Sequence, residues 1–293
     1  MKHVEKGYLE NIGITSDPRT RAMVLRERVQ RRELLANRLK LAAYLGDKSS
    51  KIALRGTAPE QGEVVNSVSE LRGWVKSLKE YGGRDALARA IIASTRTVLP
   101  IYERWYRRRN HGQNDSRVSD AIEGAENWLT SKGRTADRIG ESAVVYGHYA
   151  SGFTDAITAA IVASKAVNEA AWKAKAFDED AFHAAYAAFH TLGGLLSGYP
   201  ECAVLAAERA ARAIRSSLGG GNEFATIQSA ITAELIPWAL GERDPVADRV
   251  DARQAEREAQ ESAAGRVAAV DQTRERLHEM TDEVNEQDEP SAP

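Results

Sequence analysis

The chain has 293 residues, of which 43% are hydrophobic and only 6% aromatic, and its formal net charge at pH 7 is -2. Its single cysteine, Cys202, excludes an internal disulfide and a cysteine-cluster metal site, which is typical of a reducing compartment and predicts a cytoplasmic protein. No run of about 18 uncharged apolar residues is present and the first residues lack a signal peptide's apolar core, so we expect neither a membrane span nor export.

Apolar residues recur at intervals of three and four along most of the chain, whereas two-residue alternation is absent. This pattern predicts an all-α protein, built as an array of antiparallel helices. The first helix is expected to begin at Asp17-Pro18, because aspartate caps a first turn and proline suits the first helical position. A second helix carries leucines from Leu34 to Leu45 and ends at Gly46. Residues 1–55 are therefore interpreted as a small N-terminal helical unit.

Residues 56–64 contain Pro59 and two glycines and form the predicted linker, which is followed by a main helical domain over residues 65–250. In this domain Ser67 or Ser69 can cap a helix that ends at Gly82-Gly83, and Pro100 is expected to bend or break the next one.

Farther along, Asp115 is expected to cap a helix whose apolar face ends at Trp128. Pro200 suits the first turn of an alanine-rich helix, and Asn222 is expected to cap a helix that ends near Leu240.

The charges are unevenly distributed. Residues 251–293 hold 12 acidic and 5 basic side chains, whereas residues 1–250 hold 30 acidic and 35 basic ones. Val270, Leu277 and Val284 lie seven residues apart, which allows a helix over part of this segment. We expect residues 251–293 to form a charged, mobile tail that is partly helical or disordered and contributes to solubility.

One segment combines arginines with aromatic residues. The predicted binding residues are Arg104, Trp105, Arg107, Arg108 and Arg109, next to Tyr102, Tyr106 and His111. Arginines can contact phosphates while aromatic rings stack on bases, so this composition is compatible with nucleic-acid binding. The alternative is a helix whose aromatic residues face the core and whose arginines reach solvent. The arginines from Arg26 to Arg38, which alternate with glutamates, are interpreted in that second way.

The residues that could bind a metal are His148, His183 and His190. His183 and His190 lie two helical turns apart, about 10 Å along a helix, so they cannot hold one ion together without ligands from other helices. Whether the three histidines converge in space stays open, and packed histidines are the interpretation we prefer. Cys202 lies near a predicted helix start, where a thiolate would be stabilised, but we interpret it as a small buried side chain. No catalytic residue, metal or cofactor is predicted.

Three stretches carry a family resemblance: LRERV at 25–29 through RLKLAAYLGD at 38–47, DSR at 115–117 through AIEGAENWL at 121–129, and IPWALGERDPV at 236–246. They resemble alanine-rich helical bacterial proteins, and the middle stretch is similar to immunity proteins of bacterial polymorphic toxin systems. This resemblance implies a protein that binds and neutralises a toxin domain, and it brings no catalytic residues with it.

The sequence therefore predicts a non-enzymatic factor that binds a protein partner, such as an immunity or defence-associated protein. Two alternatives stay open: a nucleic-acid-associated protein that uses the segment from Arg104 to His111, and a helical enzyme or metalloprotein that uses the central histidines. Salt-dependent retention of nucleic acid would favour the first, and stoichiometric metal in the purified protein would favour the second.

Overall fold

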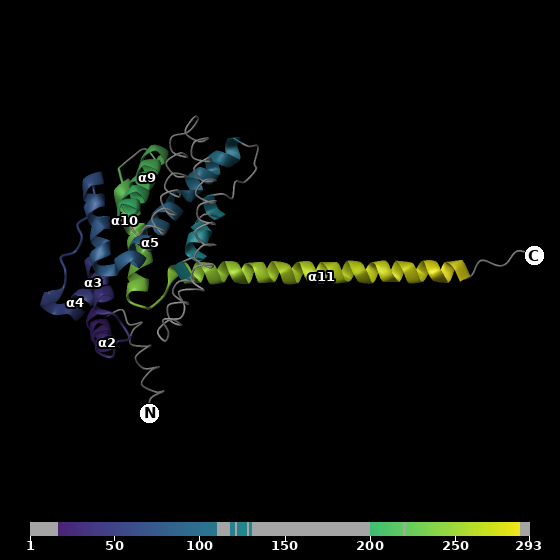
Figure 1. Cartoon of the computed structure of the whole chain (residues 1–293), viewed down its shortest axis with the longest axis horizontal. Coiled ribbons are helices and arrows are strands. Elements are labelled where there is room, and N and C mark those ends of the chain that lie inside the picture. The colour runs from purple at the N-terminus through teal and green to yellow at the C-terminus, as the bar shows by residue number, and fades with distance from the viewer. Residues whose placement is uncertain are drawn as a thin grey trace, which may run out of the picture. The chain divides into compact units, whose positions relative to one another are not determined.

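The computed structural model describes residues 17–109, 118–120, 122–127, 129–130, 200–218 and 221–287. The protein is all-α, as predicted, and these residues include no strand. The elements are α2 (Pro18–Gln30), α3 (Ala36–Tyr44), α4 (Lys48–Leu54), the 3-10 helix η1 (Arg55–Thr57), α5 (Val68–Arg109), α9 (Pro200–Leu218), α10 (Glu223–Ala239) and α11 (Pro245–Gln287) (Figure 1). Residues 1–247 form one compact unit and residues 248–293 a second.

The start of α2 confirms the predicted cap at Asp17. Its carboxylate accepts hydrogen bonds from the backbone amides of Arg19 (3.4 Å) and Thr20 (2.9 Å), and Pro18 occupies the first helical position. The Thr20 hydroxyl also donates to this carboxylate at 2.5 Å, and these bonds hold the pKa of Asp17 below its ordinary value of 3.8. Asp47 caps α4 in the same way, through the amide of Ser50 at 2.7 Å. The Asp17 side chain thus satisfies two of the unpaired amides that begin α2, and the Asp47 side chain satisfies one that begins α4.

The predicted end at Gly82-Gly83 appears as a break inside α5. Gly83 has φ 65° and ψ -154°, a backbone conformation that side chains strongly disfavour, so helical geometry is interrupted there. Gly82 allows close packing instead, because a Cβ at this position would lie 2.7 Å from Cδ2 of Leu41 on α3. After the break, the helix continues through Pro100 to Arg109.

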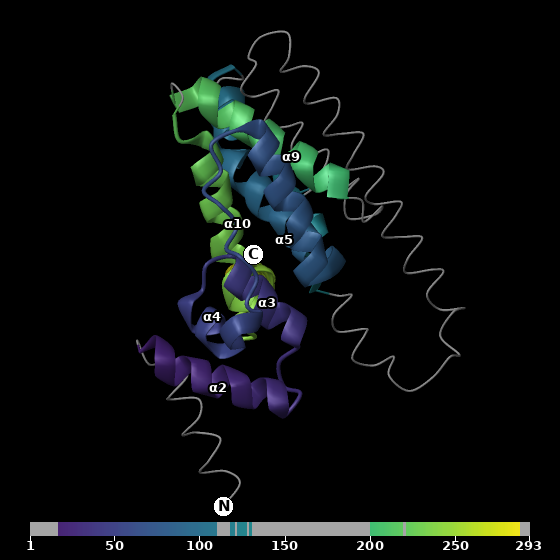
Figure 2. The ribbon, with the colours of Figure 1, turned by 90° about the vertical axis from the view of Figure 1, so that its left-hand side faces the viewer.

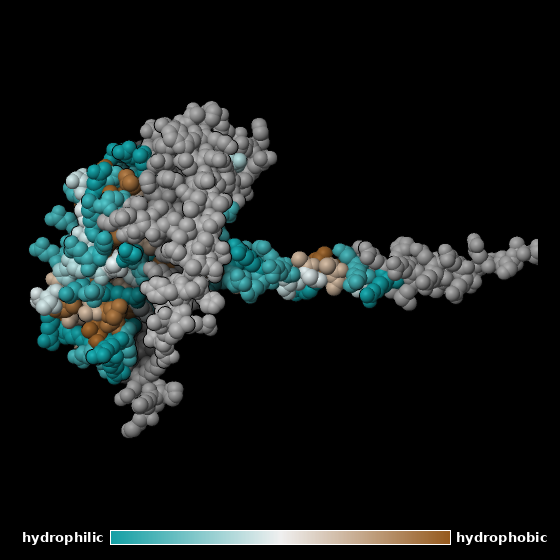
Figure 3. Space-filling model, in the orientation of Figure 1, coloured by the Kyte–Doolittle hydropathy of each residue, from teal (hydrophilic) through white to brown (hydrophobic). Residues whose placement is uncertain are grey.

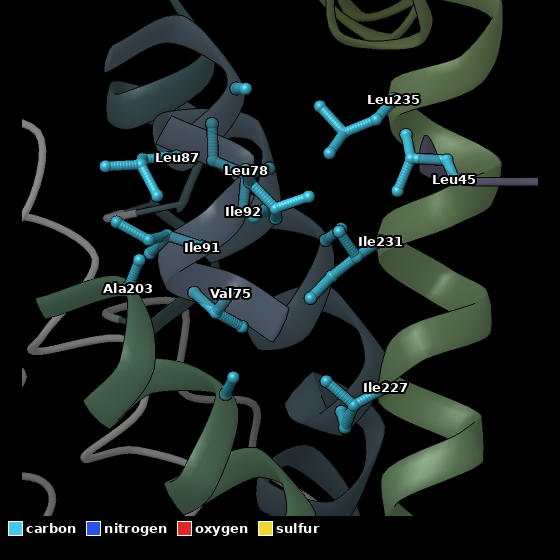
Figure 4. Packing of buried hydrophobic residues seen from close by; sticks show 14 of the residues in the cluster. Leu45, Val75, Leu78, Leu87, Ile91, Ile92, Ala203, Ile227, Ile231 and Leu235 are labelled. Carbon is cyan, nitrogen blue, oxygen red and sulfur yellow. The ribbon is translucent and has the colours of Figure 1, made fainter. Parts of the chain in front are cut away.

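The core of the first unit lies between α5, α9 and α10 (Figures 2 and 4). Helix α5 contributes large aliphatic residues, whereas α9 contributes alanines that let the helices approach closely. Figure 4 shows Val75, Leu78, Ile91 and Ile92 of α5 near Ile227, Ile231 and Leu235 of α10 and Ala203 of α9. The same cluster includes Leu25 of α2 and Leu39, Leu41 and Leu45 in or next to α3.

Segments of the chain between α5 and α9 add to this core. Residues 118–120, 122–127 and 129–130 are helical, and Val118, Ile122, Ala125 and Leu129 are buried. The predicted cap Asp115 and the predicted core residue Trp128 lie outside the described residues.

Ion pairs with buried carboxylates connect neighbouring helices of the first unit. Arg96 of α5 holds Glu126, which has no solvent exposure, through two bonds of 2.7 and 2.6 Å. Arg72 of α5 pairs with the buried Glu208 of α9, and Arg215 of α9 pairs with Glu223 at the start of α10. A buried carboxylate is costly unless it is paired, so these contacts fix which helix faces meet.

The second unit is different, because none of its side chains that the structure describes is buried. Residues 254–273 of α11 are exposed on every side of the helix, including the apolar side chains of Val267 and Val270. Over the part of the chain that the structure describes, no helix is both long and apolar enough to cross a lipid bilayer.

Candidate functional site

The predicted binding segment forms the last turns of α5. Tyr102 is fully buried, and its ring centroid lies 5.8 Å from that of Trp105 and 6.2 Å from that of Tyr106. Trp105 and Tyr106 are half-buried and pack against the core. The structure therefore brings the aromatic rings together, but on the side of the helix that faces the interior.

The basic residues of this segment reach solvent. Arg104, Arg107 and Arg108 are exposed, and Nε of Arg104 donates to the carbonyl oxygen of Pro100 at 3.2 Å. Nη2 of Arg107 lies 3.6 Å from Oε2 of Glu103, one helical turn away. Arg109 is helical but its side chain lies outside the described set, as does His111. This arrangement resembles a solvated helix end, and nucleic-acid binding here stays a prediction.

The predicted metal candidates His148, His183 and His190 lie outside the described residues. Cys202 lies in the first turn of α9, but its side chain is also outside them. Among the residues that are described, no group of three or more His, Cys, Asp or Glu side chains is arranged to hold a metal ion.

The arginines of α2 have structural partners. Nε of Arg26 donates to the carbonyl oxygen of Ala53 at 2.8 Å and Nη2 to that of Ile52 at 2.5 Å, at the end of α4. Nη1 of Arg28 donates to the carbonyl oxygen of Leu240 at 2.8 Å, at the end of α10. Carbonyl groups at helix ends lack intrahelical donors, and a guanidinium provides them with a favourable charge. These two arginines thus attach α2 to its neighbours.

A second charged cluster surrounds Trp238 of α10. The guanidinium carbons of Arg38 and Arg89 lie 4.4 and 4.6 Å from the ring centroid, which allows two cation–π contacts. Arg89 is buried and holds the Asp244 carboxylate through two bonds of 2.5 and 2.7 Å. Asp244 in turn accepts from the amides of Val246 and Ala247 at the start of α11.

The pKa values of Arg38 and Asp244 are both lowered, but for different reasons. Burial is the main cause that lowers the pKa of Arg38. Burial would raise the pKa of Asp244, but its hydrogen bonds and ion pair with Arg89, together with the two backbone amides, lower it below 3.8. Because every charge has a partner or an aromatic face, the cluster is best explained as a structural connection.

The exposed faces of α2 and α4 combine apolar and basic side chains. Met23 is 68% and Ile52 39% exposed, Arg19 and Lys48 are exposed on the same two helices, and the exposed Arg55 directly follows α4. We call these five residues the α2–α4 surface. Lys48 and Ile52 are spaced by four residues and therefore share one face of α4. Figure 3 shows hydrophobic side chains among hydrophilic ones over α2 and α4.

This surface belongs to a strongly basic part of the chain. Residues 17–57 contain 11 basic and 4 acidic residues, although residues 1–250 as a whole are only mildly basic. The arginines from Arg26 to Arg38 are evident in the sequence, but the excess over residues 17–57 is hidden when charges are summed over residues 1–250. A window of 40 residues would have found it.

Arg55 adopts a backbone conformation that favours glycine. Its φ is 52° and its ψ -130°, at the point where α4 ends and η1 begins. A non-glycine residue at positive φ costs about 1–3 kcal/mol of stability. The Arg55 side chain makes no hydrogen bond or ion pair with any other residue that the structure describes. No side-chain contact with a described residue therefore offsets the conformational cost. This makes Arg55 a candidate for contact with another molecule.

Comparison with protein-family models, with curated proteins and with solved structures found no match to the chain.

Proposed function

We propose that this chain is a non-enzymatic protein that binds a protein partner through the α2–α4 surface. The observation that carries the proposal is Arg55, an exposed arginine held in a conformation suited to glycine, directly after α4 and three residues after the exposed Ile52. The Arg55 backbone hydrogen-bonds to Ile52 and Ala58, but its side chain makes no hydrogen bond or ion pair with a described residue that would offset the conformational cost. Such sites are frequent where function requires a particular side chain.

The composition of the surface agrees with a protein partner. Apolar side chains surrounded by polar ones are typical of protein interfaces, where arginine and methionine are enriched. The partner would present a complementary surface, apolar at its centre and acidic around it, because opposite charges steer association and exclude wrong partners. A nucleic acid fits less well, since Met23 and Ile52 offer no contact to phosphates and no ring for stacking.

The resemblance to immunity proteins of polymorphic toxin systems supplies a more specific proposal. The protein would bind a toxin domain and block its activity by covering it. No catalytic group is needed for this, which agrees with the structural use of the charged side chains around Trp238 and at the helix ends.

The experiment combines growth and binding measurements. The protein encoded beside this gene is expressed with and without the chain, and the affinity of the two purified proteins is measured by calorimetry. We expect growth arrest by the neighbour alone, rescue by the chain, and loss of both rescue and binding with Ile52→Glu. A neighbour that neither arrests growth nor binds the chain would contradict the toxin-neutralising role.

Val64→Glu is the matched control. Val64 is 66% exposed but lies outside the α2–α4 surface, so the same change of charge should leave rescue and affinity unchanged. Equal loss with both variants would show that binding does not use the α2–α4 surface specifically.

A further inference from the structure

Arg32 is a second arginine in a backbone conformation that favours glycine. Its φ is 61°, and within the described ranges only Arg32 and Arg55 combine a positive φ with a side chain. Arg32 directly follows the cap residue of α2, and Arg55 is the cap residue of α4. The same unfavourable choice of residue therefore recurs at the ends of two helices.

The ends of α3 and α10 show which residue this position ordinarily holds. Directly after their cap residues they have Gly46 and Gly241, with φ 103° and 61°. The amides of Arg32, Gly46 and Gly241 each donate to the carbonyl oxygen three residues back, at 3.1 Å. The amide that follows each of them donates to the carbonyl oxygen five residues back, at 2.9, 2.9 and 3.0 Å. Glycine adopts this ending without strain, so the backbone of α2 explains the positive φ but not the arginine.

The other arginines of residues 17–57 have partners within the chain. Their partners are carboxylates, carbonyl oxygens or an aromatic ring, and these arginines are Arg19, Arg21, Arg26, Arg28, Arg31 and Arg38. Arg32 and Arg55 are exposed, and neither side chain makes a hydrogen bond or ion pair with a residue that the structure describes. The two arginines whose conformation lowers stability are thus the two that are available to another molecule.

The two arginines lie at the same end of a helix pair. Helices α2 and α4 lie side by side (Figure 2). Arg21 near the start of α2 pairs with Asp47, which caps the start of α4, whereas Arg26 donates to carbonyl oxygens at the end of α4. The helices therefore run in the same direction, and Arg32 and Arg55 follow their neighbouring C-terminal ends.

The residues near the two arginines indicate the kind of ligand. Leu35, three residues after Arg32, is 64% exposed, and Ile52, three residues before Arg55, is 39% exposed. Arginine next to exposed apolar area is typical of protein interfaces. A guanidinium binds a carboxylate through two parallel hydrogen bonds, and the 11 basic and 4 acidic residues of segment 17–57 attract negative charge. An acidic protein segment satisfies both features, whereas a phosphate backbone would leave the two aliphatic side chains without contacts.

We propose that Arg32 and Arg55 bind two carboxylate groups of the partner protein. This inference rests on the proposed protein-binding function. It extends the binding surface to the end of α2 and names the chemical groups that the partner presents. Replacing either arginine by glycine should stabilise the chain and weaken binding, a combination that a purely structural role does not produce.

The experiment first requires a purified partner. This is the protein encoded beside the gene if that protein binds the chain. If it does not, the photo-crosslinking amino acid p-benzoylphenylalanine is placed at position 35 of the full chain in its native cells, and the protein cross-linked there is purified.

Affinity for this partner is then measured for Arg32→Gly and for the control Arg31→Gln. Both variants lose one positive charge at neighbouring exposed positions, but Arg31 already pairs with Glu27. We expect Arg32→Gly to raise the melting temperature by about 2–4 °C and to weaken binding about tenfold. Arg31→Gln should leave the affinity unchanged. A lower melting temperature for Arg32→Gly, unchanged binding by it, or an equal loss with both variants would overturn the proposal.

A carbodiimide tests the carboxylates directly, because it joins lysine amines to carboxylates in contact with them. The complexes of Arg32→Lys, Arg55→Lys and the exposed control Val64→Lys are treated and their peptides analysed by mass spectrometry. We expect amide bonds from positions 32 and 55 to aspartates or glutamates of the partner, and none from position 64. Absence of these bonds, or bonds from all three positions alike, would overturn the assignment of carboxylates.

The two proposals fail separately. If the neighbouring protein does not bind but a captured protein loses affinity with Arg32→Gly, the toxin-neutralising role is wrong and the carboxylate site stands. If Ile52→Glu abolishes rescue while Arg32→Gly binds as tightly as the wild type, the proposed function stands and the carboxylate site is wrong. If the neighbouring protein does not bind and no protein is captured at position 35, both are wrong.

Discussion

Helices α5 and α11 have nearly the same length, 42 and 43 residues, but different surroundings. Leu71, Val75 and Leu78 on α5 have no solvent exposure, whereas Val267 and Val270 on α11 are more than 60% exposed. Both stretches form helices because their local sequences favour helices. Burial of apolar area adds to this preference at Val75 of α5 but not over residues 254–273 of α11, so the same substitution should have very different effects at these two places.

The largest expected difference comes from removing the same two methyl groups from both helices. Val75→Ala should lower the free energy of unfolding by about 2 kcal/mol or more, because it removes buried apolar area and leaves a cavity. Val267→Ala should change it by less than about 0.5 kcal/mol, as is usual for an exposed position. Urea unfolding of both variants measures the difference. Similar values for both would contradict the comparison.

The pair of Arg89 and Asp244 comes next, since it connects α5 to the first turn of α11 within the first unit. Arg89→Met keeps most of the buried volume but removes both bonds to Asp244. We expect the free energy of unfolding to fall by about 1–2 kcal/mol. The expected decrease is small because the Asp244 side chain is 35% exposed and can be hydrated when Arg89 is absent. Thermal unfolding of both proteins at pH 7 measures this change in stability. A variant as stable as the wild type would show that the pair is dispensable.

The same pair predicts a dependence on pH. Because the pKa of Asp244 is lower when folded, its contribution to stability is complete above its ordinary pKa of 3.8 and is lost as pH falls through the lowered value. Asp244→Asn should therefore show a smaller loss of stability than the wild type between pH 5 and strong acid. Denaturant unfolding at several pH values tests this, and parallel curves would exclude Asp244 as a contributor.

Arg55 is a residue of the first unit whose backbone conformation lowers the stability of that unit. Arg55→Gly should raise the free energy of unfolding by about 1 kcal/mol, because glycine adopts a positive φ without strain. The same variant should bind the proposed partner less tightly. Calorimetric unfolding measures the gain, and a loss of stability would show that the Arg55 side chain has a structural role.

The smallest effect is expected from removing residues 262–293. These residues include the exposed middle of α11, so the melting temperature of the first unit should stay nearly unchanged while helical circular dichroism decreases. A fall of several degrees would show that this segment contributes to the stability of the first unit.

The sequence was sufficient for features that depend on a few neighbouring residues. Asp17-Pro18 begins α2, Gly83 interrupts α5, and Pro200 begins α9, because capping, ring geometry and freedom at positive φ act over one helical turn. The all-α class followed from apolar spacing for the same reason. The sequence also revealed the basic aromatic segment of the candidate site. It could not reveal that Tyr102 is buried, because aromatic residues at intervals of three or four have the same pattern whether they face the core or a ligand.

Only the tertiary structure decided which distant residues meet. Arg28 donates to Leu240, 212 positions along the chain, and Arg89 pairs with Asp244 across 155 positions. Such contacts depend on the packing of whole helices. The sequence alone does not indicate which of its many arginines will meet which partner. The conformation of Arg55 was equally hidden, because positive φ at an arginine opposes the local preference and persists only where the surrounding structure imposes it.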